Sequence, residues 1–289
     1  MTPKFQFLKW RIGHPKRDAL RREMIAWFEA EGRADDPEYA ELADFLRHNP
    51  PDFLPYDFAR DIHARAIQIH EDPKVGLPFI DHNGKRLYWR EGRKLKRIPK
   101  DYNAICAEQH PASPHRYLSD RFDITDGDVL VDVGSAEGSL SLDVIDRVGH
   151  VYLFETDASW TRALEATFAP WAEKVTIVPK FVGNETRGDM IRLDDYFGTD
   201  QRIDFLKLDV EGYEAEVLDG ARGLIDAGCV TRTAVCAYHR REDEANLTRL
   251  LIELGFEVEV TPRYMLLYRE DGFAPPYVRR GLLRATRAA

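Results

Sequence analysis

Long apolar runs, paired cysteines and an excess of positive charge are all missing from this sequence of 289 residues. No apolar run approaches the ~18 residues that a membrane-spanning helix needs, so we expect no transmembrane segment. The three cysteines form no CxxC pair and no even set, which is typical of a reducing compartment. Residues 1–17 are basic but lack the apolar core of a signal peptide, and we therefore expect a cytoplasmic protein.

The charge balance also limits the partners. The net charge is −9, which disfavours sequence-independent binding to a phosphate backbone, and we expect no nucleic-acid partner. Hydrophobic residues make up 44% of the chain, enough for a sizeable packed core, and charged residues make up 31%. The composition therefore predicts a globular protein, and it leaves a homo-oligomer open.

The first 116 residues are predicted to be a mainly helical region that covers a substrate cleft. In residues 19–30 the apolar side chains recur at helical spacing, and residues 39–46 and 58–69 repeat that pattern. Asn83-Gly84 lies between two β-rich runs and predicts a hairpin, because this pair readily adopts two positive φ angles.

Residues 117–272 change character and predict an α/β domain. Short apolar runs alternate with helical stretches, which indicates a mostly parallel sheet covered on both faces. The expected strands are 128–133, 150–155, 174–178, 203–209 and 233–238, and the expected helices are 139–147, 159–168 and 214–227. Residues 256–260 and 264–268 are expected to form a terminal antiparallel hairpin. This is the seven-stranded Rossmann-like layout of class I methyltransferases, and residues 273–289 are expected to be a basic, frayed C-terminal tail.

A glycine loop follows the first expected strand of this domain. Its sequence, VDVGSAEG at residues 131–138, has G-x-x-x-G spacing and not the G-x-G-x-x-G spacing of dinucleotide enzymes. Acidic side chains in the loop would repel a pyrophosphate but would suit the cationic sulfonium and ammonium of S-adenosylmethionine. The predicted cofactor residues of the loop are Asp132, Gly134, Ser135, Glu137 and Gly138.

Glu155 ends the second strand, where a carboxylate can accept both ribose hydroxyls of the cofactor. The alternative is a solvated acid at a strand end. Thr156 is expected beside the ribose, and Gly183 and Asn184, after the third strand, are expected near the adenine.

The segment IDFLKLDVEGYEAEVLDGA at residues 203–221 strongly resembles the FkbM family of methyltransferases. The family's lysine-x-aspartate-x-glutamate-glycine pattern is carried by Lys207, Asp209, Glu211 and Gly212. The glycine loop and Glu155 match in order and spacing. The resemblance implies methyl transfer from S-adenosylmethionine, usually to an oxygen, with sugars of polysaccharide or natural-product pathways as frequent acceptors.

A sugar hydroxyl is a poor nucleophile, so its methylation calls for a general base or a metal ion. Asp209, Glu211 and His239 are predicted to converge at the carboxyl ends of the fourth and fifth strands. Asp209 is the first choice for base or metal ligand, and His239 is the second. These three residues could hold Mg²⁺ or another divalent metal, although Mg²⁺ prefers oxygen ligands and His239 offers nitrogen. Alternatively, Asp209 and Glu211 cap the following helix. Lys207 is expected to pair with an acid.

Four further residues are predicted to contact the acceptor. His115 and Arg116 lie in a proline-held loop before the first strand, and Tyr238 and Arg240 follow the fifth strand. The alternatives are that His115 and Arg116 contact the cofactor carboxylate, or that His115 has a structural role. The sequence thus favours an O-methyltransferase acting on a sugar or glycan hydroxyl. A peptide, amine or small phenolic acceptor, or a non-catalytic scaffold that keeps the fold, are the alternatives.

Overall fold

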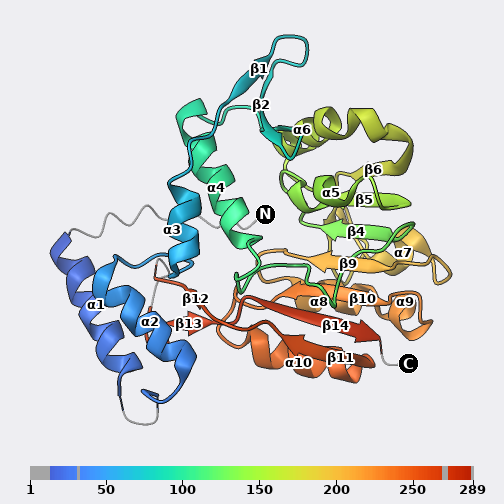
Figure 1. The fold of residues 1–289 in the computed structure, drawn as a ribbon. Helices are drawn as coiled ribbons and strands as arrows, with labels where there is room; N and C mark the ends of the chain where they lie inside the picture. Colours follow the sequence, from blue (N-terminus) through green and yellow to red (C-terminus); the bar gives the residue numbers. More distant parts are fainter. Residues whose placement is uncertain (1–13, 31–32, 269–272, 288–289) are drawn as a thin grey trace.

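The computed structural model describes residues 14–30, 33–268 and 273–287, and it consists of an N-terminal region beside an α/β body (Figure 1). The elements of the N-terminal region are α1 (His14–Phe28), α2 (Pro37–His48), α3 (Asp57–His63), β1 (His70–Asp72), β2 (Leu77–His82), β3 (Lys85–Tyr88), the 3-10 helix η1 (Leu95–Arg97) and α4 (Ile98–Glu108). Asn83 and Gly84 adopt φ angles of 54° and 82° and join β2 to β3, which confirms the predicted hairpin.

The α/β body begins after α4 and extends to residue 287. Its elements are β4 (Val129–Val133), α5 (Ser139–Val144), β5 (His150–Phe154), α6 (Ala158–Phe168), η2 (Ala169–Lys174), β6 (Val175–Val178), β7 (Phe181–Val182), β8 (Met190–Ile191), α7 (Leu193–Phe197), β9 (Phe205–Leu208), α8 (Glu214–Gly220), α9 (Arg222–Asp226), β10 (Arg232–Cys236), α10 (Asp243–Glu253), β11 (Phe256–Val260), β12 (Met265–Leu266), β13 (Val278–Arg279) and β14 (Leu282–Arg287). The expected helix at 214–227 is divided into α8 and α9 at Ala221.

Seven strands form one sheet in the order β11-β14-β10-β9-β4-β5-β6. β6, β5, β4, β9 and β10 run parallel, and β14 is antiparallel to both of its neighbours. The predicted Rossmann-like fold with a mostly parallel seven-stranded sheet is confirmed. One apolar cluster joins the sheet to α8 and α10 through residues such as Leu206 and Leu247, and another joins it to α5 and α6 through residues such as Leu153 and Leu164.

The antiparallel partner of β11 is β14, so the predicted hairpin between 256–260 and 264–268 is wrong. Met265 and Leu266 form β12, which pairs with β13 outside the main sheet. Both side chains are buried in a cluster with Met24 and Phe28 of α1. Residues 264–268 are therefore apolar because they support the N-terminal helices, which lie next to β12 and β13 in Figure 1.

The prediction that residues 273–289 form a frayed tail is also wrong for the described part of that segment. β14 lies between β10 and β11, and four of its six residues are buried. The Arg284 guanidinium donates hydrogen bonds to the carbonyl oxygens of Arg116 and Tyr117, and one of its amino groups lies 3.3 Å from Glu259. A basic residue is tolerated in this strand because backbone oxygens satisfy its donors.

Candidate active site

The glycine loop between β4 and α5 presses against the end of β9. Gly134 adopts a φ of 76°, and a Cβ at this position would lie 2.0 Å from the carbonyl oxygen of Asp209. Only glycine therefore fits, and its presence brings the loop next to the Asp209 backbone. Ser135 is buried, and its hydroxyl has no hydrogen-bond partner among the described residues. A buried hydroxyl without a partner is a ready contact for a polar ligand.

Glu155 lies one residue beyond β5 and is tied to the glycine loop. One carboxylate oxygen accepts a hydrogen bond from the Ala136 backbone N–H at 2.9 Å, and the other accepts from the Asp157 N–H at 2.7 Å. Burial raises the pKa of Glu155. An ionised carboxylate offers about four acceptor positions, so two remain for a pair of ribose hydroxyls. Thr156, the next residue, is exposed.

Asp132 and Lys207 form a buried ion pair beneath the loop. Lys207 Nζ lies 3.0 Å from Asp132 Oδ1 and donates to the Gly134 carbonyl oxygen at 2.7 Å. The other Asp132 oxygen accepts from the Ser141 hydroxyl at 2.8 Å. The predicted pairing of Lys207 with an acid is confirmed. The predicted contact of Asp132 with the cofactor is not supported by this geometry, because the residue is 1% exposed and its carboxylate is engaged.

The remaining cofactor candidates lie on both sides of this loop. Glu137 accepts a hydrogen bond from the Ser139 hydroxyl at 2.7 Å, and burial raises the pKa of Glu137. Gly183 packs against α8, since a Cβ on Gly220 would lie 2.0 Å from the Gly183 carbonyl oxygen. Asn184 is exposed beside it.

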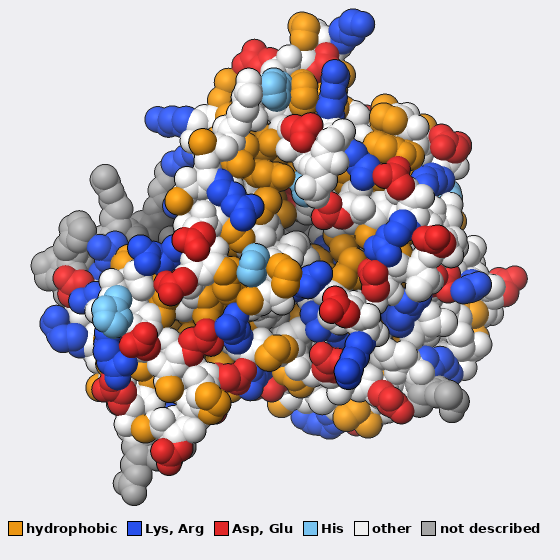
Figure 2. All heavy atoms as spheres, viewed as in Figure 1, with side chains coloured by type: hydrophobic (Ala, Val, Ile, Leu, Met, Phe, Trp, Pro, Cys, Tyr) orange, Lys and Arg blue, Asp and Glu red, His pale blue; other side chains and the backbone are white. Residues whose placement is uncertain are grey.

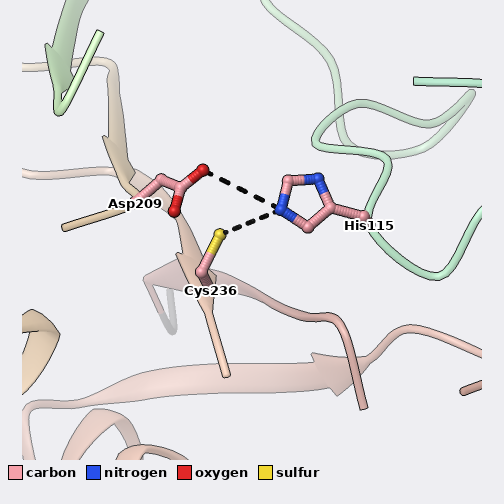
Figure 3. A group of neighbouring side chains, drawn as sticks. All are labelled: His115, Asp209 and Cys236. Carbon is pink, nitrogen blue, oxygen red and sulfur yellow. Dashed lines mark hydrogen bonds and ion pairs between the residues drawn. The ribbon is translucent and has the colours of Figure 1, made fainter. Parts of the chain in front are cut away.

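Asp209 follows β9 and is surrounded by polar side chains from three segments. Tyr117 donates a hydrogen bond to Asp209 Oδ2 at 2.8 Å, and His115 Nε2 lies 3.8 Å from the same oxygen (Figure 3). Burial alone would raise the pKa of Asp209, but the positive charges of Lys207 and His239 lower it to about 2. Asp209 is therefore an anion throughout the physiological pH range.

His239 lies between two carboxylates. Its Nδ1 is 2.9 Å from Glu214 and its Nε2 is 3.4 Å from Asp209, while Glu211 is 3.9 Å away. Burial would lower the pKa of His239, but the hydrogen bond with Glu214 and the charge of Asp209 raise it to about 9. The His239 side chain is thus a protonated, positively charged imidazolium at neutral pH, which disfavours the prediction that His239 acts as a base.

Sequence reasoning missed Glu214. Its carboxylate is 1% exposed and accepts hydrogen bonds from the backbone N–H groups of Val210 and Gly212. This turn brings Glu211 into positive φ (55°) and leaves its side chain 63% exposed at the rim of the site. The alternative that Asp209 and Glu211 cap α8 is not supported, because among the described residues neither carboxylate accepts a hydrogen bond from a backbone N–H of that helix. The sequence offers one signal for this role, because Glu214 is an acidic residue in the first helical turn after Glu211 and Gly212.

The structure brings His115 and Tyr238 together and leaves the two predicted arginines nearer the surface. His115 is 1% exposed, its ring lies 5.3 Å from that of Tyr238, and its Nε2 is 3.5 Å from the sulfur of Cys236. Burial lowers the pKa of His115 to about 4. His115 therefore contacts Asp209 and Cys236 as a neutral ring, and direct contact with an acceptor is not supported. Arg116 is half-buried, and the Arg240 side chain is 54% exposed.

Residues 99–258, more than half of the sequence, match the family described as the methyltransferase FkbM domain. The chain belongs to the FkbM methyltransferase family. The matched range runs from α4 to β11 and includes the glycine loop, Glu155, Asp209 and His239. The prediction that the chain is a member of the FkbM family and the prediction that it is a methyltransferase are both confirmed. No curated protein matches the sequence.

Several solved structures similar to this FkbM protein are described as methyltransferases, and their sequence identity to it is low. An FkbM methyltransferase from Methylobacillus flagellatus is 18% identical with a TM-score of 0.46, and the match covers 86% of this chain and 65% of that one. TrmK of M. capricolum, solved with S-adenosylhomocysteine, is 12% identical with a TM-score of 0.39 and coverages of 59% and 69%. An O-methyltransferase from Thermotoga maritima is 19% identical with a TM-score of 0.35 and coverages of 58% and 62%. None of the helices in the described ranges has the length and apolar character of a transmembrane span.

The metal site predicted for this FkbM domain is not the cluster that the structure forms. Ligand atoms of Asp209, His239 and Glu214 lie within 4.8 Å of one another, and so do those of Asp209, His115 and Cys236, but Glu211 belongs to neither group. Mg²⁺ prefers oxygen ligands in octahedral geometry. Both groups include an imidazole, and Glu214 is already occupied by two backbone N–H groups. The residues therefore fit Mg²⁺ poorly.

Glu108, the last residue of α4, is a second acid that sequence reasoning did not select. Burial raises its pKa to about 8, and the negative charges of Asp209, Glu137 and Glu211 add to the effect. A carboxyl group with this pKa, among the acids of the site, has the proton affinity of a general base near neutral pH. In the sequence, Glu108 is the last residue of an ordinary amphipathic helix, and this position does not predict a general base.

Proposed function

We propose that this FkbM protein transfers the methyl group of S-adenosylmethionine to a hydroxyl oxygen of a sugar or glycan. The observation that carries the proposal is Asp209, a half-buried anion held at the end of β9 against the glycine loop. A fixed anion beside the reacting atoms stabilises the positive charge that moves from sulfur towards the acceptor oxygen. The sugar class rests on the family resemblance.

In this proposal the cofactor lies over the glycine loop. Glu155 would accept the ribose hydroxyls with its two remaining acceptor positions, and Ser135 would bond the methionine part through its unpartnered hydroxyl. Glu137 would attract the ammonium group, and Gly183 and Asn184 would flank the adenine. When bound, S-adenosylmethionine supplies both the methyl group and the leaving group, so the protein has to position the acceptor and remove its proton.

The acceptor side divides the chemistry among several residues. Asp209 would accept a hydrogen bond from the reacting hydroxyl and orient it, and protonated His239 would hold Asp209 in place. The single proton of that hydroxyl would stay hydrogen-bonded to Asp209 during methyl transfer and would then pass to ionised Glu108, because a pKa of about 8 suits a proton acceptor better than the pKa of about 2 at Asp209. Glu211, Arg116, Tyr238 and Arg240 would contact the rest of the acceptor.

Isothermal titration calorimetry tests the cofactor half of the proposal. We expect wild-type protein to bind S-adenosylhomocysteine and not NAD, and Glu155→Ala to weaken that binding about tenfold or more, since two hydrogen bonds are lost. Glu257→Ala, a change of an exposed acid on β11, is the matched control and should leave binding unchanged. Folded wild-type protein that binds no S-adenosylhomocysteine would instead favour a scaffold that keeps the fold.

Radiolabelled methyl transfer tests the acceptor half. We expect methyl transfer to glycosides. EDTA should leave this transfer unchanged, because the residues of the site fit Mg²⁺ poorly. Transfer to peptides, amines or small phenols, with none to glycosides, would replace the sugar acceptor by that class.

A further inference from the structure

A 480 Å³ pocket lies where α4, the β2–β3 hairpin, residues 65–70 and the start of α5 meet. Figure 2 shows the face of the molecule on which the N-terminal region meets the α/β body, with hydrophobic side chains exposed along that line. The lining of the pocket includes no residue to which the proposed function assigns a role. Its size suits one monosaccharide unit or a group of similar volume.

The wall of the pocket is polar and rigidly held. His82 is 5% exposed; its Nδ1 lies 2.9 Å from the Tyr102 hydroxyl and its Nε2 lies 3.0 Å from Asp143. Asn83 donates a hydrogen bond to the same Asp143 oxygen at 2.8 Å. These contacts fix a ring, a hydroxyl and a carboxylate in one orientation before any ligand arrives, which lowers the entropy cost of binding.

Asn103 leaves an acceptor unused in this wall. The residue is 2% exposed, and its amide nitrogen donates to the Arg65 carbonyl oxygen at 2.9 Å. Its Oδ1 has no hydrogen-bond partner among the described residues. A buried acceptor without a donor is costly, and a ligand hydroxyl would satisfy it. Apolar neighbours such as Ile80 and Ile105 offer van der Waals contact to the C–H face of a sugar ring.

The pocket adjoins the proposed reaction centre at two points. Gln109 lines the pocket, and its side-chain oxygen accepts a hydrogen bond from the backbone N–H of Tyr117, whose hydroxyl bonds Asp209. Ser139 also lines the pocket and donates to Glu137 of the glycine loop. A ligand that contacts Gln109 and Ser139 would therefore be one residue away from Tyr117 and Glu137 of the proposed reaction centre.

We propose that this pocket binds the non-reacting part of the acceptor, a neutral, hydroxyl-rich group such as a sugar ring. The proposal rests on the proposed function and adds to it a binding site in the N-terminal region. It assigns the recognition of the acceptor to Asn103 and the Tyr102–His82 pair, while methyl transfer takes place at Asp209.

Saturation-transfer NMR and calorimetry test the pocket with methyl α-glucoside, methyl β-galactoside and methyl α-rhamnoside, in the presence of S-adenosylhomocysteine. Ala66→Trp fills the mouth of the pocket from an exposed position, and Asn103→Leu removes the unpartnered acceptor. We expect at least one glycoside to bind wild-type protein and each variant to weaken that binding about tenfold, while S-adenosylhomocysteine affinity stays constant. Asn246→Leu, an exposed change on α10, is the matched control.

Melting temperatures establish whether each variant is folded. If Asn103→Leu does not fold, the binding measured with Ala66→Trp decides the test. The proposal is overturned if no glycoside binds wild-type protein that holds S-adenosylhomocysteine. It is also overturned if binding in Ala66→Trp stays within twofold of wild type. Failure of wild-type protein to bind S-adenosylhomocysteine would overturn the proposed function instead, and glycoside binding that Ala66→Trp abolishes would still support the pocket.

Discussion

Replacing Lys207 with methionine is expected to destabilise the protein strongly, because it leaves a buried carboxylate without its counter-charge. Lys207 is 4% exposed and Asp132 is 1% exposed, and their charged atoms are 3.0 Å apart. Lys207 also donates to the Gly134 carbonyl oxygen, so the same change removes a support of the glycine loop. Methionine keeps the length of the side chain, which limits the loss of packing.

The magnitude follows from the burial of both partners. Removing one member of a buried ion pair costs about 3–5 kcal/mol of unfolding free energy. A protein of this size loses roughly 2–4 °C of melting temperature per kcal/mol, so we expect a decrease of about 6–20 °C. The double variant Lys207→Met/Asp132→Leu removes both charges and should recover a large part of this loss, since no unpaired charge remains.

Differential scanning calorimetry of the single and double variants measures these effects. Lys180→Met is the matched control, because Lys180 also bonds a backbone carbonyl and faces an aspartate at 3.9 Å, but on the surface. Its cost should be below about 1 kcal/mol. A melting temperature of Lys207→Met equal to that of Lys180→Met would refute the reasoning. So would a double variant less stable than Lys207→Met alone.

Two further predictions concern catalysis. Asp209→Asn removes the fixed anion and should lower kcat about 100-fold or more, while the affinity for S-adenosylhomocysteine changes little. Steady-state kinetics measure kcat and calorimetry measures the affinity. An unchanged kcat would contradict the role assigned to Asp209. Glu108 has to lose its proton to act as a base, so kcat/KM of wild-type protein should rise as the pH increases through about 8. Glu108→Gln should lack this rise, and its persistence in the variant would exclude Glu108 as the base.

The parallel strands and the glycine loop could be predicted because their signals are local. Runs such as residues 128–133, DVLVDV, are rich in valine and leucine, as is typical of strands that are buried on both faces. The turn at Gly134 is encoded by one residue that tolerates positive φ and close backbone contact. The position of Glu155 beside the loop then follows from adjacent parallel strands.

The last strand and the charge state of the site could not be predicted, because distant residues determine them. Arg284 looks like part of a solvated tail, but the carbonyl oxygens of residues 116–118 and the Glu259 carboxylate make it acceptable in an interior strand. The proton on His239 depends on Glu214, which looks like an ordinary acid in the first turn of a helix. The spacing of the motifs predicts that Asp209 and His239 meet at one edge of the sheet, but it does not predict which of them carries a proton.

That protonation changes the role that Asp209 can take in the proposed reaction. A carboxylate with a pKa of about 2 is a weak base, so taking a proton from a sugar hydroxyl would be unfavourable. The same low pKa keeps the negative charge in place throughout the reaction. During methyl transfer, positive charge develops on the acceptor oxygen, and a fixed anion that bonds its hydroxyl stabilises that charge without being consumed. Lys207 and His239 lower the basicity of Asp209 and hold it as that anion, which leaves proton removal to a weaker acid such as Glu108.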